Sequence, residues 1–283
     1  MSAGAQRWYR PRELAEALAI KASRGADVQP IAGGTDLMVA WRLSTAPMPA
    51  LLDLGAIGEL RGICEDPDRV VIGATTPCST LAADARIQRG WPMLAQSAAL
   101  TGSVAIQNRA TLGGNVMNAS PAADNPPVLL AYGARLHLAS ASGRRVVDYS
   151  GFHTGYRQTI ARPDELVVAI ELPRPAEATT VWYRKVGTRR AQAISKVALA
   201  ACLQWQGSRV IRARFGFASL GPVPALAGAL AHRVEGCDPG RLDAGALAQA
   251  IDEDFRPIDD VRSTGAYRRQ VAINLVRGAL GLA

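Results

Sequence analysis

Two segments with paired glycines constrain the fold of this chain more than any other feature. Gly33-Gly34 lies between a strand predicted at 28–32 and a helix predicted at 37–43, and Gly113-Gly114 lies in a stretch rich in Gly, Ser, Asn and Ala. Paired glycines let the backbone turn tightly and let a ligand approach it closely. Successive amide groups that lead into a helix bind anions. Either segment alone indicates only a turn, but the two together favour a site for two phosphates.

The residues after the second glycine pair extend this interpretation. Ser120 and Asp124 carry the kind of oxygen atom that binds ribose or ribityl hydroxyls. Two phosphates and a polyol are what a dinucleotide presents, so the sequence predicts a dinucleotide site. Asp124 has a plainer alternative, which is to cap a helix predicted at 126–132.

Length and composition allow a folded protein with a substantial core. Of the 283 residues, 48% are hydrophobic and 20% are charged, which excludes a mostly disordered chain. The net charge of +8 first suggests nucleic acid as a partner. Aromatic residues make up only 5% of the chain, however, and no basic run is interleaved with them. We therefore expect no nucleic acid, and an anionic small ligand or an acidic partner subunit explains the charge better.

The cysteines Cys64, Cys78, Cys202 and Cys237 stand far apart in the sequence. Without a C-x-x-C pair they predict no zinc site, redox motif or iron–sulfur cluster on this chain. Residues 1–12 carry several charges and no apolar stretch of signal-peptide length. No segment reaches the roughly 18 apolar residues of a membrane helix. We expect a cytoplasmic protein without a membrane span.

The common catalytic motifs are absent from the sequence. It contains no Gly-x-Gly, no Walker A loop and no G-x-S-x-G elbow. His137, His153 and His232 stand alone, without the spacing of metal ligands. The sequence therefore predicts no catalytic side chain and no metal site, and we expect the chemistry to belong to a bound cofactor.

Periodicity predicts an amphipathic helix near each end of the chain. The first covers 11–24, with its buried face expected to include Leu14, Ala17, Leu18 and Ala22. The last covers 267–280, where four residues recur at a spacing of four and predict the buried face: Tyr267, Val271, Leu275 and Ala279.

Pro173-Arg174-Pro175 marks the strongest change of pattern and predicts a domain boundary. We expect one domain at 1–173 and a second at 174–283. The second contains three predicted strands followed by helices, which is typical of an α+β domain. Within the first, the stretch 101–125 lacks periodicity and is predicted to be one long functional loop.

Several longer segments resemble the FAD-binding medium subunit of the molybdenum hydroxylases, the flavoprotein family of xanthine dehydrogenase and carbon monoxide dehydrogenase. In chain order they are PIAGGTDL at 30–37, NRATLGGN at 108–115, NASPAAD at 118–124, FHTGYR at 152–157 and YRKVGTRR at 183–190. Because a further match, Tyr267-Arg268-Arg269, lies in the predicted last helix, the resemblance covers nearly the whole chain.

The resemblance implies an α+β fold. The family has a two-subdomain FAD-binding domain of the vanillyl-alcohol-oxidase (PCMH) type, followed by a small α+β C-terminal domain. Transferred to this chain, the two subdomains would cover about 1–55 and 56–173.

The resemblance also implies which residues bind FAD. Both glycine loops would hold the pyrophosphate through backbone amides, Asp124 would bind the sugar region, and Lys185 would lie near the flavin. The Val167 backbone would contact the flavin ring, while Thr101 and Ile194 would flank its faces. The full predicted set is Ile31, Ala32, Gly33, Gly34, Thr35, Asp36, Leu37, Thr101, Thr111, Gly113, Gly114, Asn115, Ser120, Asp124, Val167, Lys185 and Ile194.

Some of these positions have simpler interpretations. Thr101 stands where animal xanthine dehydrogenases have an aromatic residue. Lys185 could be a solvated cation on a strand, and Val167 and Ile194 would be core residues in any fold. Arg189-Arg190 is an ordinary surface pair, and we do not place it at the site.

The resemblance implies an oxidoreductase subunit whose redox chemistry belongs to FAD. A large partner would hold the molybdenum cofactor and a small partner would hold [2Fe-2S] clusters, in a heterotrimer or its dimer. Electrons would pass from those clusters through FAD to NAD+ or another acceptor, such as oxygen or a quinone. Two alternatives stay open: a stand-alone flavin oxidase, with His153 as the candidate for a flavin link, and a non-redox assembly module.

Overall fold

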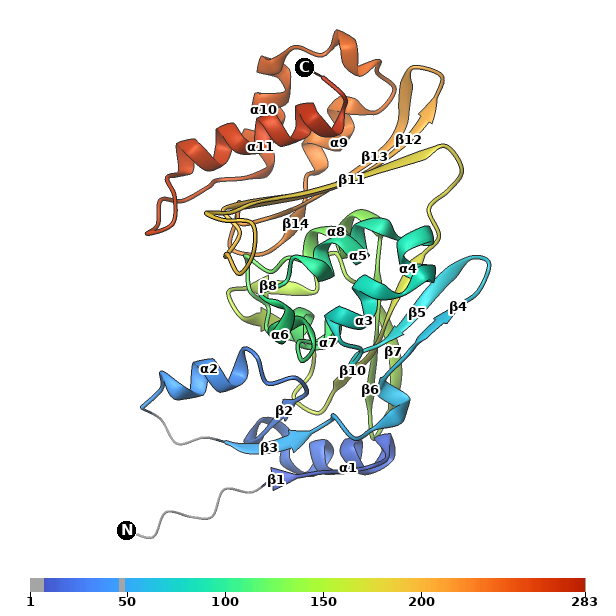
Figure 1. Cartoon of the computed structure of the whole chain (residues 1–283), viewed down its shortest axis with the longest axis vertical. Coiled ribbons are helices and arrows are strands. Elements are labelled where there is room, and N and C mark those ends of the chain that lie inside the picture. Colours follow the sequence, from blue (N-terminus) through green and yellow to red (C-terminus); the bar gives the residue numbers. More distant parts are fainter. Residues whose placement is uncertain (1–7, 46–48, 283) are drawn as a thin grey trace.

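The computed structural model describes residues 8–45 and 49–282, and its N-terminal part is a small α/β unit (Figure 1). Three strands form a parallel sheet in the order β1-β3-β2. Helix α1 packs on this sheet, whereas α2 has no buried residue and extends to one side of the molecule. The elements are β1 (Trp8–Tyr9), α1 (Leu14–Arg24), β2 (Val28–Ile31), α2 (Leu37–Arg42) and β3 (Ala50–Asp53).

The middle of the chain forms a five-stranded antiparallel sheet in the order β4-β5-β10-β6-β7, with helices over one face. The strands are β4 (Ile63–Glu65), β5 (Arg69–Gly73), β6 (Arg135–Ser140), β7 (Gly143–Asp148) and β10 (Leu166–Pro173). The helices are α3 (Cys78–Ala83), α4 (Ala85–Gly90), α5 (Pro92–Ala99), α6 (Val104–Gln107), α7 (Leu112–Met117) and α8 (Pro126–Tyr132). A two-stranded hairpin, β8 (His153–Gly155) and β9 (Gln158–Thr159), precedes β10.

The C-terminal part is a four-stranded antiparallel sheet in the order β11-β12-β13-β14, followed by three helices. The strands are β11 (Thr179–Val186), β12 (Val197–Gln206), β13 (Arg209–Ala218) and β14 (Ala225–Leu226). The helices are α9 (Gly228–Val234), α10 (Ala244–Asp254) and α11 (Gly265–Ala279). The observed mixture of strands and helices agrees with the predicted α+β class.

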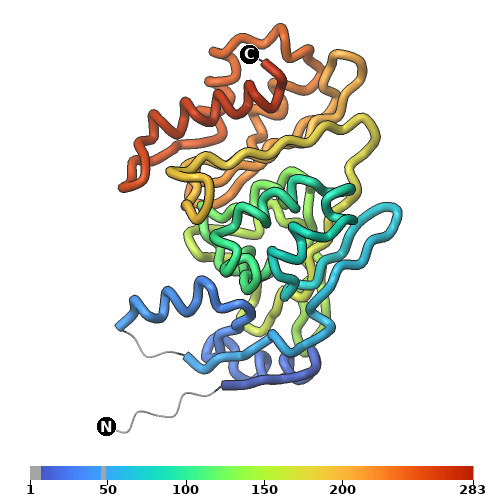
Figure 2. Tube along the Cα trace, in the orientation of Figure 1, coloured from blue at the N-terminus to red at the C-terminus, as the bar shows by residue number. Residues whose placement is uncertain are grey.

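Three hydrophobic clusters show how these layers are joined. The first lies between α1 and the end of the five-stranded sheet, and the second between that sheet and its helices. The third fills the space between the C-terminal sheet and α9–α11. Tyr183, Ala198 and Ala200 on the opposite face of the C-terminal sheet belong to the second cluster. That sheet is therefore buried on both faces and shares a core with α5 and α8. Figure 2 shows the chain segments of these helices next to the sheet.

The buried face of each amphipathic helix differs by one position or more from the prediction. In α1, Lys21 is buried and Ala22 is exposed, because Lys21 Nζ donates to the carbonyls of Gly25 at 2.6 Å and Val28 at 3.0 Å. Tyr267 in α11 is 44% exposed. A spacing of four advances about 40° beyond a full helical turn at each step, so the predicted row drifts away from the core. The residues buried in α11 are Arg268, Ala272, Ile273, Leu275 and Val276.

The predicted loop at 101–125 contains two short helices, α6 and α7. Hydroxyl groups cap both, since Ser103 Oγ accepts from the Ile106 amide and Thr111 Oγ1 from the Gly114 amide. The prediction of one loop was wrong because helices of four and six residues are too short to show an apolar period.

Candidate cofactor site

The first glycine loop connects β2 to α2 through a left-handed glycine. Gly34 has φ +73, a conformation that glycine adopts without a steric penalty. Its carbonyl accepts the Met38 amide at 3.0 Å and so begins α2. At the other end of the loop, the Ile31 carbonyl accepts the Leu54 amide at 2.8 Å, which ties β2 to the end of β3.

The second glycine loop is fixed to the five-stranded sheet. The Gly113 amide donates to the Ala74 carbonyl at 2.8 Å, and the Ala74 amide donates to the Val168 carbonyl of β10 at 3.0 Å. Thr111 caps α7 through its hydroxyl, which accepts the Gly114 amide at 3.2 Å. The loop is therefore a rigid part of the core, and its glycines are held in one position.

The two loops touch each other, and the contact requires a glycine. A methyl group on Gly33 would lie 1.8 Å from the Arg109 carbonyl oxygen, just before the second loop. A methyl group on Gly113 would lie 2.7 Å from the Ala74 carbonyl oxygen. At Gly114 it would meet only the Thr111 hydroxyl, at 2.8 Å. One glycine of each pair thus serves close packing, whereas Gly114 is exposed and a Cβ there would meet a single hydroxyl group.

Asn125 connects the second loop to the helices around it, and the sequence analysis did not single it out. Its side chain is fully buried. It donates to Asn115 Oδ1 at 3.1 Å and to Thr101 Oγ1 at 3.3 Å, and it accepts from Ser97 Oγ at 2.8 Å. An asparagine directly before two prolines resembles an ordinary helix start, so no sequence signal distinguishes it.

Asp124 and Lys185 form a buried ion pair beside this network. Lys185 Nζ lies 2.7 Å from Asp124 Oδ2 and donates to the Leu100 carbonyl at 3.1 Å. The Tyr183 hydroxyl donates to the Asp124 carbonyl at 3.2 Å. Burial raises the pKa of Asp124 to about 6, although Lys185 opposes the shift. Lys185 is thus not the solvated cation that its simpler interpretation suggested.

The second carboxylate oxygen of Asp124 is unsatisfied. Oδ1 is buried and has no hydrogen-bond partner among the residues that the structure describes. A buried acceptor without a donor costs about 1–3 kcal/mol, so such atoms mark places where a ligand or water belongs. Asp124 is not the cap of α8 either, since no side-chain cap is found at the start of that helix.

The other predicted residues surround the second loop in different ways. Thr101 is buried, and its hydroxyl donates to the Ser97 carbonyl at 2.9 Å. Val167 is buried at an irregularity of β10, beneath α7. Ile194 is 56% exposed, on a segment whose Gln192 amide donates to the Gly102 carbonyl at 3.1 Å. Thr101 and Val167 can therefore face a ligand only through their backbones, whereas the Ile194 side chain is accessible.

Three residues with left-handed backbones converge on the segment before Asp124. Ala119, Arg157 and Ser219 have φ of 46, 56 and 68. The Arg157 amide donates to the Ala119 carbonyl at 3.2 Å, and the Ser219 amide donates to the Pro121 carbonyl at 2.8 Å. Such conformations cost about 1–3 kcal/mol each and cluster at ligand sites. Ser120 lies between these contacts, and its hydroxyl accepts the Ala122 amide at 3.3 Å.

These features fit a dinucleotide. The loop 31–37 offers backbone amides for the phosphates, and the exposed Gly114 of the touching second loop leaves their approach free of a side chain. The Gly113 and Gly114 amides are not available for this role, because they are bonded to Ala74 and Thr111. The unpartnered oxygen of Asp124 offers an acceptor for a polyol hydroxyl. No group of three or more metal-binding side chains occurs within 8–45 and 49–282. In the same ranges no helix is long and apolar enough to cross a membrane.

His153 is a core residue of this region. It is 7% exposed, and its Nε2 lies 2.8 Å from the Val116 carbonyl. Its ring packs edge-on against Tyr149 at a centroid distance of 5.4 Å. A nitrogen bonded in this way is not available for a covalent link to a flavin.

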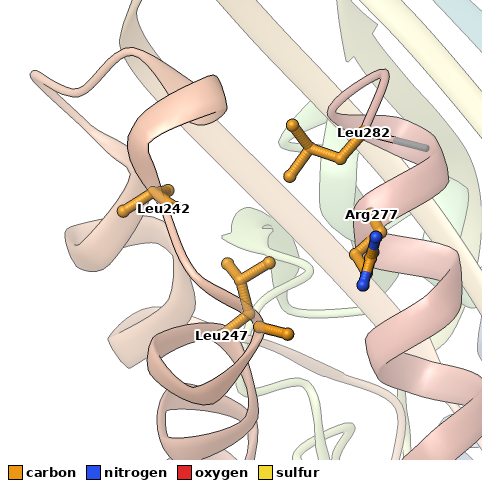
Figure 3. Close-up of a pocket in the computed structure, with 5 residues that line it drawn as sticks. Leu242, Leu247, Arg277 and Leu282 are labelled. Atoms are coloured by element: carbon orange, nitrogen blue, oxygen red, sulfur yellow. The ribbon is translucent and has the colours of Figure 1, made fainter.

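A separate pocket of about 210 Å³ lies between α10 and α11 (Figure 3). Its lining is Leu242, Ala244, Leu247, Arg277 and Leu282. It lies among the helices that cover the far face of the C-terminal sheet and includes no predicted site residue.

Two sequence families match this chain. Residues 3–175 match the family described as the FAD binding domain in molybdopterin dehydrogenase, and residues 182–283 match the CO dehydrogenase flavoprotein C-terminal domain. The carbon monoxide dehydrogenase medium chain of Hydrogenophaga pseudoflava is 29% identical, over 98% of this chain and 96% of the relative. A xanthine dehydrogenase FAD-binding subunit of Escherichia coli O157:H7 is 28% identical, over 92% and 90%.

Solved structures share the whole architecture. Carbon monoxide dehydrogenase from Hydrogenophaga pseudoflava superposes with a TM-score of 0.93 at 29% identity, covering 98% of this chain and 96% of that one. Quinoline 2-oxidoreductase from Pseudomonas putida 86 superposes with a TM-score of 0.87 at 26% identity, covering 99% and 97%. These likenesses confirm the predicted fold.

Proposed function

Because this chain belongs to the family of FAD-binding domains in molybdopterin dehydrogenases, we propose that it transfers electrons between iron–sulfur clusters of a partner and a final acceptor. The observation that carries the proposal is the pair of touching glycine loops beside the unpartnered Asp124 oxygen. This arrangement suits a bound dinucleotide.

Family membership confirms three predictions from the sequence: the family itself, FAD as the cofactor, and an oxidoreductase subunit of the molybdenum hydroxylase type. Bound FAD supplies the capacity to take up and release electrons singly or in pairs. The protein's part is to bind FAD, orient it and control its surroundings.

We assign the following roles to the site residues. Amides of the loop 31–37 bind the phosphates, the loop 111–115 borders them at its exposed Gly114, and Asp124 accepts a hydrogen bond from a hydroxyl of the cofactor. Lys185 keeps that carboxylate in place and supplies a positive charge nearby. Thr101, Val167 and Ile194 border the flavin ring.

We propose two partner subunits, a large one with the molybdenum cofactor and a small one with [2Fe-2S] clusters, in a heterotrimer or its dimer. Relatives named as medium chains support this assembly. The four cysteines are free thiols, which supports clusters held on another chain and a cytoplasmic location. We place the boundary between the two domains at 173/174, where β10 ends and shortly before the first matched family ends at residue 175.

We propose NAD+ as the final acceptor, with oxygen or a quinone as the competing outcomes of the test. The alternative of a stand-alone flavin oxidase loses its candidate link, since His153 Nε2 is bonded to Val116. The alternative of a non-redox module is disfavoured because both loops are intact.

The acceptor can be tested on the complex copurified with this chain. We expect the visible flavin absorbance of the dithionite-reduced complex to recover rapidly with NAD+ and slowly with oxygen or a quinone. If the absorbance recovered faster with oxygen or with a quinone, that compound would be the acceptor in place of NAD+. Activity of this chain alone on an organic substrate would refute its role as an electron-transfer subunit.

The site itself can be tested with two glycine substitutions. We expect Gly34→Val and Gly114→Val each to abolish FAD retention, because a side chain would occupy the approach of the phosphates. The measurement is the ratio of flavin absorbance to protein after purification.

A matched control separates this effect from backbone strain at Gly34. Gly207 also has a left-handed φ, +60, lies in an exposed turn and has open space around it. Gly207→Val should therefore carry a similar strain and retain FAD. Normal flavin content in both loop variants would show that the loops are misassigned.

A further inference from the structure

Arg268 is a buried arginine at the start of α11. It is 5% exposed, although the surrounding turn of the helix faces solvent. Its guanidinium donates to the Ser219 carbonyl at 2.7 Å, to the Lys196 carbonyl at 3.4 Å and to Asp260 Oδ1 at 2.7 Å. It therefore joins the last helix to one end of an antiparallel strand pair, where the start of β12 lies beside the end of β13.

Stability alone does not account for this arrangement. Removing an arginine from water costs several kcal/mol, which a single partly exposed carboxylate does not recover. The Nε atom is also buried without a partner among the described residues. An apolar side chain at this position would stabilise the core more simply, so the geometry points to a purpose served by the hydrogen bonds themselves.

Ser219, the first partner of Arg268, is the junction between the C-terminal sheet and the cofactor site. Its backbone is left-handed, with φ +68. Its amide donates to the Pro121 carbonyl at 2.8 Å, and its hydroxyl donates to the Ser195 carbonyl at 3.0 Å. Arg268 holds the carbonyl of this strained residue from the other side.

The segments held in this way belong to the candidate site. Pro121 lies between Ser120 and Asp124, and Ser195 directly follows Ile194. Arg268 thus acts on both sides of the site, through Pro121 on one and through Ser195 and Lys196 on the other.

We propose that Arg268 is a positioning residue for FAD, which fixes the Ser219 turn and with it the 119–124 segment and the Ile194 loop. This inference rests on the proposed binding of FAD at these segments. Arg268 does not touch the cofactor, and its effect on FAD passes through the backbones of Ser219 and Lys196.

The test is FAD titration of the purified full chain, with Arg268→Met compared to Arg269→Met. Arg269 is its neighbour on the same helix and pairs with Asp252 at the surface. We expect the Kd for FAD to rise about tenfold in Arg268→Met, which corresponds to losing one or two charged hydrogen bonds. It should change less than about twofold in Arg269→Met, since exposed ion pairs contribute little.

Two further readouts separate positioning from a general loss of stability. Arg268→Lys can donate to only part of the same set of oxygens, so we expect it to restore FAD affinity in part. The visible spectrum of the bound flavin should change in Arg268→Met and stay unchanged in Arg269→Met. A lowered melting temperature with unchanged Kd and spectrum would overturn the proposal.

Ser219→Gly tests the same junction if Arg268→Met does not fold. Glycine accepts the left-handed backbone, so the fold should hold, while the bond to Ser195 is lost. We expect the Kd for FAD to rise about threefold, which is less than the tenfold rise expected for Arg268→Met. Wild-type affinity in both Ser219→Gly and Arg268→Lys would refute the proposal. A wild-type chain that binds no FAD, or Gly114→Val that retains it, would instead refute the proposed site.

Discussion

The two glycine loops both have a Gly-Gly pair at their centre, but the protein holds them in place in different ways. The first leads into α2, a helix without a buried residue, and no side chain caps it. The second lies within the core, where Thr111 caps α7 and Gly113 is bonded to Ala74. The first loop packs against the second, where Gly33 contacts the Arg109 carbonyl group.

The two glycines of a pair can therefore serve different purposes. Gly33 and Gly113 are required for contact with neighbouring backbone, at distances that no methyl group tolerates. Gly114 meets only a hydroxyl group and stays open to a ligand. A site of this kind therefore has one loop that forms part of the core and a second loop that is placed against it.

The most direct way to break this arrangement is Gly33→Ala. Its methyl group would lie 1.8 Å from the Arg109 carbonyl oxygen, so the two loops must separate. We expect the free energy of unfolding to fall by about 3 kcal/mol or more and FAD to be lost. Chemical denaturation and FAD titration measure the two effects.

Gly58→Ala is the matched control for this substitution. Gly58 is exposed and has nothing within 4 Å of the position where a Cβ would lie. Its free energy of unfolding should change by less than about 0.5 kcal/mol. Equal effects of the two substitutions would show that the loops do not depend on their contact.

The sequence predicted the elements of the site better than the contacts between them. Both glycine pairs, the strand before Gly33 and the threonine before Gly113 are local signals, and they follow from backbone chemistry. The contact between Gly33 and Arg109 joins residues 76 positions apart. No local pattern records such a contact, and the sequence offered no distinction between the two glycines of a pair.

Long-range burial explains the other differences. Asn125 and Arg268 are polar side chains whose partners come from distant elements, so periodicity assigned them no role. Lys21 is buried for a more local reason, because its ammonium group is bonded to two carbonyls just after the helix. The approximate positions of strands and helices follow from hydrophobic patterns, whereas buried polar residues depend on partners that the patterns do not show.

The second loop also leads to a buried carboxylate, Asp124, whose ionisation makes stability depend on pH. Burial raises the pKa of Asp124 from its usual 3.8 to about 6, so between these values the folded protein keeps a proton that the unfolded chain has released. The stability of the protein without FAD should then fall as the pH rises from about 4 to about 6, and stay level above. The fall should be up to about 3 kcal/mol.

Asp124→Asn isolates this effect from the other carboxylates. Arginine partners lower the pKa of Glu165, so the stability that it contributes is lost as the pH falls, in the opposite sense. Unfolding of the wild type and of Asp124→Asn should therefore be compared at each pH. We expect equal stability near pH 4 and a less stable wild type above pH 6. If the wild type instead became more stable than the variant as the pH rises, the attraction of Lys185 for the Asp124 carboxylate would outweigh the cost of burying it.

The smallest predicted effect distinguishes the two loops by their threonines. The Thr111 hydroxyl accepts the Gly114 amide at 3.2 Å, whereas no hydrogen bond of the Thr35 hydroxyl is found among the described residues. Thr111→Val should therefore lower the free energy of unfolding by about 1 kcal/mol, and Thr35→Val should change it by less than about 0.5 kcal/mol. Denaturation of both variants without FAD measures the difference. A helix cap contributes to stability only where the rest of the protein holds that helix in place. If Thr35→Val lowered the free energy of unfolding as much as Thr111→Val, the first loop would be as firmly held as the second.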